Sequence, residues 1–216
     1  MVQSTLLSKE KSIDHYFLNR YESRSGNFLK LIGKSISCGQ MHQNKIGIVG
    51  KSIFHRNSDG LISSKKCILT IRTADCLPIF IYAPDKKVIL ALHAGWKSLF
   101  AGLITNAFQE LSLYGVDSIN VKVGIGPHIG VCCYQVDKSL IKKFMNIIAP
   151  DQPFFQEKEN NYYLNLSLVA IFQLKNKGVL QHSIDDVNIC TNCSDDYYSY
   201  RRDHTDQRNY NLLMIK

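Results

Sequence analysis

The stretch Arg72-Thr73-Ala74-Asp75-Cys76-Leu77-Pro78 lies between two short apolar runs and decides the fold around it. Cys67 to Ile71 precedes the stretch, and Ile79 to Tyr82 follows it. Both runs are bounded by turn residues and rich in β-branched and aromatic side chains, which is typical of buried strands rather than helices. Cys76 is therefore expected where a strand meets a loop.

The segment that follows repeats this arrangement. Turn residues at 84–87 lead into a third apolar run, Val88 to Leu92, which ends at His93. Positions at strand ends hold polar side chains firmly and leave them open to solvent. Cys76 and His93 are thus the first two candidates for a functional site.

The rest of the chain mixes strand and helix patterns. Further strands are expected at 14–18, 45–49, 119–125, 162–164, 187–190 and 211–215. Helical spacing of apolar residues predicts helices at 28–32, 98–114, 138–148 and 166–177, with turns or polar loops at 51–58, 149–153 and 191–203. Because strands and helices do not alternate strictly, the expected fold is α/β: a single domain over 1–216, with a mixed β-sheet flanked by helices.

Composition narrows the class of protein. The 216 residues are 45% hydrophobic and 20% charged, as in ordinary globular proteins, and no apolar run approaches the roughly 20 residues of a membrane span. The N-terminal residues lack the pattern of a secretory signal. Seven scattered cysteines fit reduced thiols, so a cytoplasmic location is expected.

The net charge of +8 raises the question of a nucleic-acid partner. The lysines are spread thinly, and no basic stripe interleaved with aromatic residues is present. Nucleic-acid binding is therefore not the expected function. The positive charge is interpreted as an ordinary solvated surface, and a local phosphate site is the alternative.

Cys76 and His93 allow more than one chemical interpretation. They fit a nucleophile with its base, a pair of metal ligands, or a packed thiol beside a core histidine. Asp75 beside Cys76 and Trp96 shortly after His93 are unusual neighbours for purely structural residues. His42, in the loop-like segment 39–44, is the natural third member of a site.

Six segments occur in an order that carries a family resemblance. They are Gln40 to His42, Arg72 to Pro78, His93 to Lys97, Gly126 to Gly130, Cys133 to Val136 and Ser199 to Asp203. Together they resemble the laccase-domain family, once called multicopper polyphenol oxidases and now described as purine nucleoside phosphorylases. The similarity runs from about 15 to 215 and implies a laccase-domain-like fold, also called cytotoxic-necrotizing-factor-like, with zinc bound by His42, Cys76 and His93.

The sequence departs from the family pattern at two places. Met41 and Gln43 flank His42 where relatives usually have valine and glycine, and the loop at 21–26 lacks the usual glycine pair. These changes affect the backbone of the loop at 39–44 that carries His42, called the metal loop below, and the substrate contacts of the loop at 21–26.

The donor set agrees with the metal that the resemblance implies. Two imidazoles and one thiolate leave a tetrahedral zinc ion with an open position, where a bound water has its pKa lowered to about 7. The same donors suit copper, particularly with a weak axial methionine such as Met41. Zinc is the expected ion, and copper is the alternative.

The resemblance implies phosphorolysis of adenosine, inosine and S-methyl-5'-thioadenosine to the free base and (methylthio)ribose 1-phosphate, and deamination of adenosine. The signature of the zinc nucleobase deaminases, His-x-Glu with Pro-Cys-x-x-Cys, is missing, because Cys190-x-x-Cys193 follows Ile189. Cys190 and Cys193 are interpreted as ordinary packed thiols, as is the pair Cys132-Cys133.

Side chains near the ligand motifs are assigned to the substrate. The predicted substrate-binding residues are Gln40, Arg72, Trp96, Lys97, Arg201 and Arg202. The cations are assigned to phosphate, Gln40 to base or ribose, and Trp96 to stacking on the purine. Asp75 and Cys76 are the predicted catalytic residues, with Asp75 orienting a ligand or shuttling a proton. Surface salt bridges, packing and loop capping are the corresponding structural alternatives.

Three other functions compete with the purine nucleoside enzyme. They are a peptidoglycan-precursor editing hydrolase, a copper-dependent polyphenol oxidase, and a non-enzymatic zinc-stabilised RNA-binding module. The sequence has no His-x-His pair, which multidomain blue-copper oxidases use repeatedly. It carries no signal for the oligomeric state.

Overall fold

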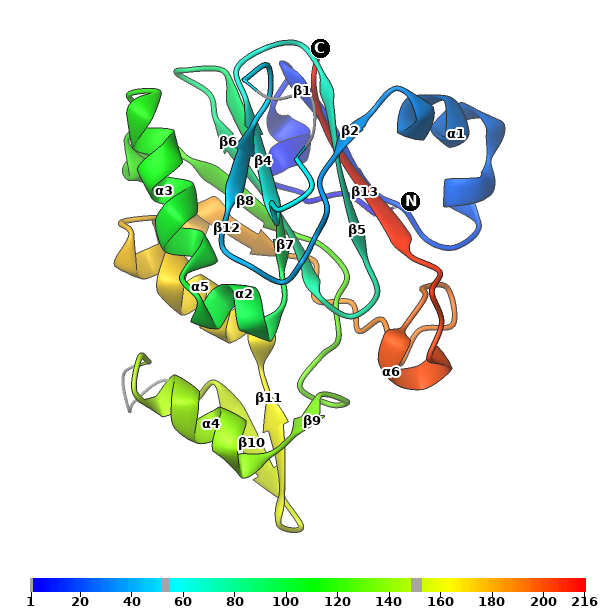
Figure 1. The fold of residues 1–216 in the computed structure, drawn as a ribbon, viewed down its shortest axis with the longest axis vertical. Helices are drawn as coiled ribbons and strands as arrows, with labels where there is room; N and C mark the ends of the chain where they lie inside the picture. The colour runs from blue at the N-terminus through cyan, green and yellow to red at the C-terminus, as the bar shows by residue number, and fades with distance from the viewer. Residues whose placement is uncertain (1, 52–54, 149–152) are drawn as a thin grey trace.

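Figure 1 shows the computed structural model, which describes residues 2–51, 55–148 and 153–216. Most of the expected turn at 149–153 and the middle of the polar segment at 51–58 lie outside the described residues. The strands are β1 (Ile13–Phe17), β2 (Ile36–Ser37), β3 (Ile46–Ile48), β4 (Gly60–Ser63), β5 (Ile68–Thr73), β6 (Leu77–Ala83), β7 (Val88–Ala94), β8 (Lys122–Ile125), β9 (Gln135–Val136), β10 (Phe155–Lys158), β11 (Asn161–Leu164), β12 (Ile184–Asp186) and β13 (Asn209–Ile215). The helices are α1 (Gly26–Gly33), α2 (Trp96–Phe100), α3 (Leu103–Leu113), α4 (Lys138–Met145), α5 (Leu166–Asn176) and α6 (Tyr200–Asp203).

Among the described residues, the strands form three sheets. The largest has the order β12-β8-β6-β7-β4-β3 and mixes parallel with antiparallel pairs, which confirms the predicted mixed sheet. Helices α2, α3 and α5 cover one of its faces, and the sheet β1-β13-β5-β2 covers the other (Figure 1). The molecule is therefore built in three layers at its centre.

The alternation of side chains along β6 explains these layers. The whole strand is buried, with Ile79 and Ile81 packed toward the helices and Phe80 and Tyr82 toward the second sheet. Successive side chains of a strand point to opposite faces, so a strand that is apolar at every position is stable only between two covering layers. The continuous apolar runs in the sequence thus correspond to the central strands.

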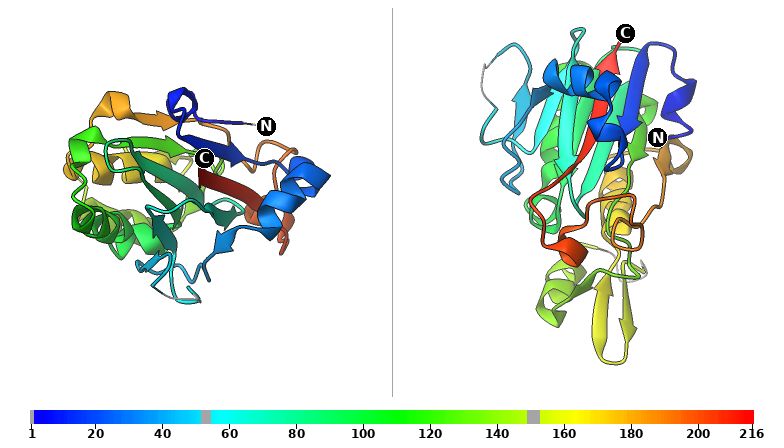
Figure 2. Two further views of the ribbon diagram at one scale, coloured as in Figure 1. Left: turned by 90° about the horizontal axis from the view of Figure 1, so that it is seen from above. Right: turned by 90° about the vertical axis from the view of Figure 1, so that its right-hand side faces the viewer.

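The third sheet, β10-β11-β9, lies apart from these layers. Together with α4 it extends from one end of the molecule, as Figure 1 and the right-hand view of Figure 2 show.

No helix within the described residues has the length and apolar character needed to span a bilayer.

The antiparallel pairing of β6 with β7 brings the expected site residues together. Leu77 pairs with Ala94 and Pro78 with His93, so the start of β6 lies beside the end of β7. Cys76, which precedes β6, is thereby placed next to His93. A single hairpin, formed by β6, a turn at 84–87 and β7, connects the two residues along the chain.

Two sequence predictions about helices are wrong in detail. The helix expected at 98–114 is two helices, α2 and α3, separated at Gly102, whose φ of 87° is left-handed. A glycine adopts this conformation at little cost, so it permits a turn that the apolar spacing alone did not indicate. The polar loop expected at 191–203 contains the short helix α6, capped by the Ser199 hydroxyl accepting from the Arg202 N–H.

Two predicted strands are also displaced. The strand expected at 187–190 lies at 184–186, and Cys190 forms only an isolated parallel bridge with His128. The strand expected at 119–125 begins at Lys122, because 118–120 form a turn of 3₁₀ helix. Of the apolar residues at these positions, Val121 is buried, Val187 and Ile189 are half-buried, and Ile119 is exposed.

Candidate metal centre

The structure brings His42, Cys76 and His93 together. One donor atom from each lies within 4.8 Å of the others. The Cys76 Sγ is 3.8 Å from His42 Nε2, and the two imidazole rings are 4.7 Å apart at an angle of 83°. A sulfur and a nitrogen at two corners of a zinc tetrahedron are expected about 3.6 Å apart. The cluster therefore has the dimensions of a metal site before any ion is bound.

Asp59 positions two of these three side chains. It is fully buried, and its Oδ1 lies 2.9 Å from His93 Nδ1. The same carboxylate accepts hydrogen bonds from the backbone N–H groups of Met41, His42 and Gln43. A carboxylate on Nδ1 fixes the imidazole in the tautomer that leaves Nε2 free for a metal. One buried side chain thus orients a ligand and holds the loop that carries another.

Strained backbone surrounds the cluster. Gln40, His42 and Asp75 have left-handed φ values of 57°, 57° and 86°. Residues other than glycine adopt this conformation only when the surrounding structure imposes it, and such positions cluster at functional sites. The strain shows that this loop is held in place by its contacts, including those with Asp59.

Gly95 leaves the space that the three donors use. A Cβ built at this position would lie 3.0 Å from Cys76 Sγ and 3.1 Å from His42 Cδ2. Any larger side chain would therefore displace the donors. These short distances give a physical reason for a glycine at position 95.

The thiol and one imidazole of the cluster have shifted pKa values. Burial would raise the pKa of the Cys76 thiol, but the nearby imidazoles of His93 and His42 outweigh it and lower that pKa to about 6. Burial likewise opposes protonation of His93, yet Cys76 and Asp59 raise the pKa of its imidazole to about 9. The thiolate, which is the form that binds metals, is therefore the main form of Cys76 at neutral pH.

The cluster opens into a cavity. Within the described part of the chain, no further His, Cys, Asp or Glu joins the three donors, so a tetrahedral ion would keep one open position. The cavity measures about 320 Å³, at the lower end of the roughly 300–1,000 Å³ of small-molecule sites. Its walls are Gly39, Gln40, His42, Arg72, Ala74, Cys76, His93, Asp206 and Arg208.

Gln40 and Arg72 lie at this cavity, as the sequence motifs implied. The Gln40 amide donates to the Arg72 carbonyl at 2.5 Å and accepts from the Arg72 backbone N–H at 2.9 Å. This pair of bonds fastens the metal loop to the end of β5. Arg72 is exposed and is among the residues that line the cavity.

Trp96 and Arg201 line a different cavity, of about 440 Å³. Arg201 donates to the carbonyls of Cys133 and Gln135 there. Lys97 is exposed, with its Nζ 5.7 Å from the Trp96 ring centre. The structure does not bring these predicted substrate contacts to the cavity of the three donors.

Asp75 and Arg202 hold the chain rather than face that cavity. Asp75 accepts from the Thr191 hydroxyl and from the Arg201 N–H, both at 2.7 Å. The Arg202 guanidinium donates to carbonyls of the 191–197 segment and to the Asp203 carboxylate. Both side chains therefore have positions suited to bracing two loops.

Sequence reasoning missed three residues of this region, namely Asp59, Asp206 and Arg208. Asp59 directly precedes β4, and an acidic residue beside a buried strand was the available signal. Asp206 and Arg208 lie in a polar loop before β13, where nothing local distinguishes them from other surface charges.

Residues 18–216 match the model of one protein family, described as multi-copper polyphenol oxidoreductase laccase. A purine nucleoside phosphorylase of Campylobacter jejuni is 28% identical over 194 residues, which are 87% of this chain and 80% of that protein. A purine nucleoside phosphorylase of Rickettsia conorii is 32% identical over 181 residues, 82% of this chain and 69% of that protein.

Solved structures share the fold. YlmD from Geobacillus stearothermophilus superimposes with a TM-score of 0.81 at 25% identity, covering 90% of this chain and 78% of that one. The hypothetical protein YfiH of Bacillus licheniformis gives a TM-score of 0.80 at 26% identity, covering 88% and 78%. The predicted laccase-domain-like fold is confirmed, and the chain belongs to the multi-copper polyphenol oxidoreductase laccase family.

Proposed function

We propose that this chain is a zinc-dependent purine nucleoside phosphorylase that converts adenosine, inosine and S-methyl-5'-thioadenosine to the free base and (methylthio)ribose 1-phosphate. One observation carries the proposal: a single cavity is lined by the three-donor cluster and by two arginines, Arg72 and Arg208. The names of the relatives from Campylobacter jejuni and Rickettsia conorii support the same substrate class.

His42, Cys76 and His93 are proposed to hold the ion. Two imidazoles and a thiolate with an open position fit a catalytic zinc site, and zinc supplies Lewis acidity and an acidified water there. Met41 is 58% exposed and is not among the residues that line the cavity, so no axial thioether supports copper. Asp59 accepts a hydrogen bond from the Nδ1 proton of His93, and an ion bound at Nε2 would take the place of the second imidazolium proton.

Arg72 and Arg208 are proposed to bind phosphate. A guanidinium offers paired N–H donors to a phosphate and stays charged at every relevant pH. Arg208 uses one terminal nitrogen on the carbonyls of Thr205 and Gln207, which fixes its position at the cavity wall. Phosphate held there would face the sugar carbon at which positive charge develops as the base departs.

Deamination of adenosine is the second activity proposed, because the open position beside Cys76 leaves room for a reactive water. A cytoplasmic location is part of the same proposal. All seven cysteines are free, as a reducing compartment would keep them.

The decisive experiment incubates the purified protein with inosine and phosphate and measures hypoxanthine and ribose 1-phosphate. Both products are expected, together with one zinc ion that depends on Cys76. Cys76→Ala should lose this ion and turnover, whereas Cys67→Ala, which removes a half-buried thiol remote from the cavity, should keep both. Ammonia released from adenosine without phosphate measures the deaminase activity.

Other outcomes would favour the competing functions. Stoichiometric copper with oxidation of phenols would favour the polyphenol oxidase, and hydrolysis of peptidoglycan precursors would favour the editing enzyme. Salt-sensitive RNA binding without turnover would favour the binding module. Full inosine turnover by Cys76→Ala would contradict the proposed site.

A further inference from the structure

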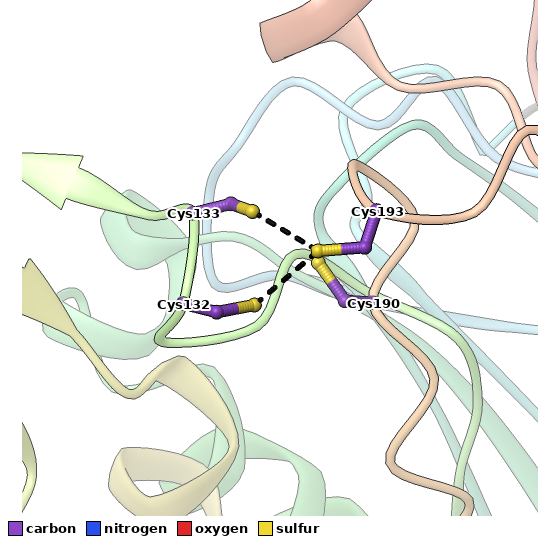
Figure 3. Close-up of side chains that lie close together, drawn as sticks. All are labelled: Cys132, Cys133, Cys190 and Cys193. Atoms are coloured by element: carbon purple, nitrogen blue, oxygen red, sulfur yellow. Dashed lines mark hydrogen bonds between the residues drawn. The ribbon is translucent and has the colours of Figure 1, made fainter.

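A second cluster of metal-binding side chains lies outside the cavity. Cys132, Cys133, Cys190 and Cys193 each present a sulfur, and the four sulfurs lie within 4.8 Å of one another. Cys193 Sγ is 3.2 Å from Cys133 Sγ and 3.6 Å from Cys132 Sγ. Figure 3 shows that the side chains come from two separate loops and converge on one point. The interpretation of these residues as unconnected packed thiols is corrected by this arrangement.

The spacing of the sulfurs suits a metal ion better than disulfides. The corners of a zinc tetrathiolate are expected about 3.8 Å apart, from zinc–sulfur bonds of about 2.3 Å. A disulfide requires about 2.05 Å, and Cys193 cannot bond to both of its neighbours at once. Cys190 and Cys193 also have the Cys-x-x-Cys spacing that is common in zinc sites, with the second pair of ligands on another loop.

The backbone around the sulfurs is arranged for a thiolate. The Gly130 N–H donates to Cys190 Sγ at 3.2 Å, and the Cys193 N–H also bonds to that sulfur. Backbone N–H groups that point at a sulfur stabilise its anionic form. A Cβ at Gly130 would lie 3.2 Å from Cys132 Sγ and 3.5 Å from Cys190 Sγ, so glycine leaves the room that the cluster occupies.

We propose that Cys132, Cys133, Cys190 and Cys193 bind a second zinc ion in a closed tetrathiolate site. Binding four thiols releases four protons and leaves the complex with two negative charges. The cations nearby suit this charge: Arg201 donates to the Cys133 carbonyl, and Arg202 donates to the Thr191 carbonyl within the Cys-x-x-Cys turn. With four protein ligands no position is open to a substrate, so the ion fastens two loops.

Both fastened loops contact Asp75, the residue before Cys76. Thr191, inside the Cys-x-x-Cys turn, donates its hydroxyl to Asp75 Oδ1 at 2.7 Å. Ile129, from the loop that leads to Cys132, donates its N–H to the Asp75 carbonyl at 2.9 Å. The second ion therefore stabilises the segment that positions the thiolate of the candidate metal centre, although it lies outside that cavity.

Metal content tests the proposal directly. The protein is saturated with zinc, passed through gel filtration, and analysed for zinc per chain. We expect two ions in the wild type, one in Cys190→Ser/Cys193→Ser, one in Cys76→Ala and none when these changes are combined. Cys67→Ser, which removes a half-buried thiol outside both clusters, should keep two ions. A wild-type zinc content in Cys190→Ser/Cys193→Ser would overturn the second site, as would a zinc-free Cys76→Ala protein.

A second measurement uses chains that keep all four cysteines. Cobalt added to Cys76→Ala should give the intense thiolate-to-metal absorption of a tetrahedral site, and its absence would overturn the proposal. In the wild type, the exposed thiols of Cys132 and Cys193 should react with a thiol reagent only after a chelator removes zinc. Immediate reaction of both, or a mass lowered by disulfide formation under anaerobic purification, would equally contradict it.

Discussion

At the scale of single residues, the candidate metal centre depends most on a side chain that binds no metal. Asp59 is fully buried, and its two carboxylate oxygens accept hydrogen bonds from three backbone N–H groups of the metal loop and bond to His93 Nδ1. Burial opposes the charge of this carboxylate, but His93 and the N–H donors hold its pKa below the usual range. The negative charge is therefore maintained where it orients two ligands.

Asp59→Asn tests this role. An amide NH₂ cannot accept from the loop N–H groups and from His93 together, so we expect zinc affinity and turnover to fall by about 10–100-fold. Isothermal titration with zinc and the inosine assay measure the two effects. Asp185→Asn is the matched control, because Asp185 also accepts from a loop, at Ser4, Thr5 and Leu6, but outside the cavity. An equal loss of zinc affinity in both variants would contradict a specific role.

Gly95→Ala tests the space between the donors. The added methyl group would lie about 3 Å from Cys76 Sγ and from the His42 ring, closer than normal contacts. We expect zinc affinity to fall at least tenfold, with a loss of stability of about 1–3 kcal/mol from the overpacked site. Gly33→Ala, at the end of α1 where nothing lies within 4 Å, should change neither property for the worse. Full zinc affinity in Gly95→Ala would show that the cluster does not need this space.

At the scale of elements, β1 anchors the N-terminal segment through a buried histidine. The Ser4 N–H donates to His15 Nε2 at 2.8 Å, which requires that nitrogen to carry no proton. His15 is 1% exposed, and its burial lowers the pKa of the imidazole to about 4, although Asp14 and Asp185 partly oppose this shift. The contact between β1 and the residues before it is therefore sensitive to acid.

The depressed pKa of His15 predicts acid-dependent stability. An unfolded histidine titrates near pH 6.5, so between about pH 6.5 and 4 the unfolded chain binds a proton that the folded chain does not. Stability therefore falls as the pH falls, by about 2 kcal/mol between pH 7 and 5 from this residue. Urea unfolding at the two pH values should show this loss in the wild type and a smaller one in His15→Gln. The same pH dependence in both chains would contradict the assignment.

At the scale of the whole molecule, the cavity combines segments that are distant in sequence. The loop at 39–42, the end of β5, the end of β7 and the loop at 206–208 meet there because the two large sheets pack face to face. The two neighbouring arginines of the Arg201-Arg202 motif point elsewhere, and Arg208 takes the position at the cavity wall. Packing of the sheets, rather than the motif, decides which arginines line the cavity of the candidate metal centre.

Arg208 and Arg202 should therefore differ when each is replaced by alanine. Arg208→Ala is expected to raise the KM for phosphate at least tenfold with little change in melting temperature. Arg202→Ala removes the charged donor that holds four carbonyls of the 191–197 segment. It should lower the melting temperature by roughly 5 °C, as for a loss of about 2 kcal/mol. Both variants are measured by phosphate-dependent kinetics and by thermal unfolding. A raised KM for phosphate in Arg202→Ala together with a lowered melting temperature in Arg208→Ala would contradict these assignments.

Features that depend on local patterns could be predicted from the amino-acid sequence alone. Continuous apolar runs identified the central strands β5, β6 and β7, and the residues where they end, Cys76 and His93, were found as site candidates for that reason. His42 came from its loop and from an ordered set of motifs, and the mixed α/β fold came from the mixture of two periodicities. Each of these signals is a short run of residues or the order of such runs along the chain, so no knowledge of packing was needed to identify them.

Contacts between side chains that are distant in the sequence became visible only in the folded chain. Asp59, Arg208 and the four clustered cysteines lie in loops whose own sequences resemble ordinary polar connections, and Gly102 ended a helix that apolar spacing alone would continue. Their roles arise from strand register and from sheets packed face to face, which join residues far apart in the chain. Because such contacts are made across the fold, no local pattern encodes them, and the structure is needed to find them.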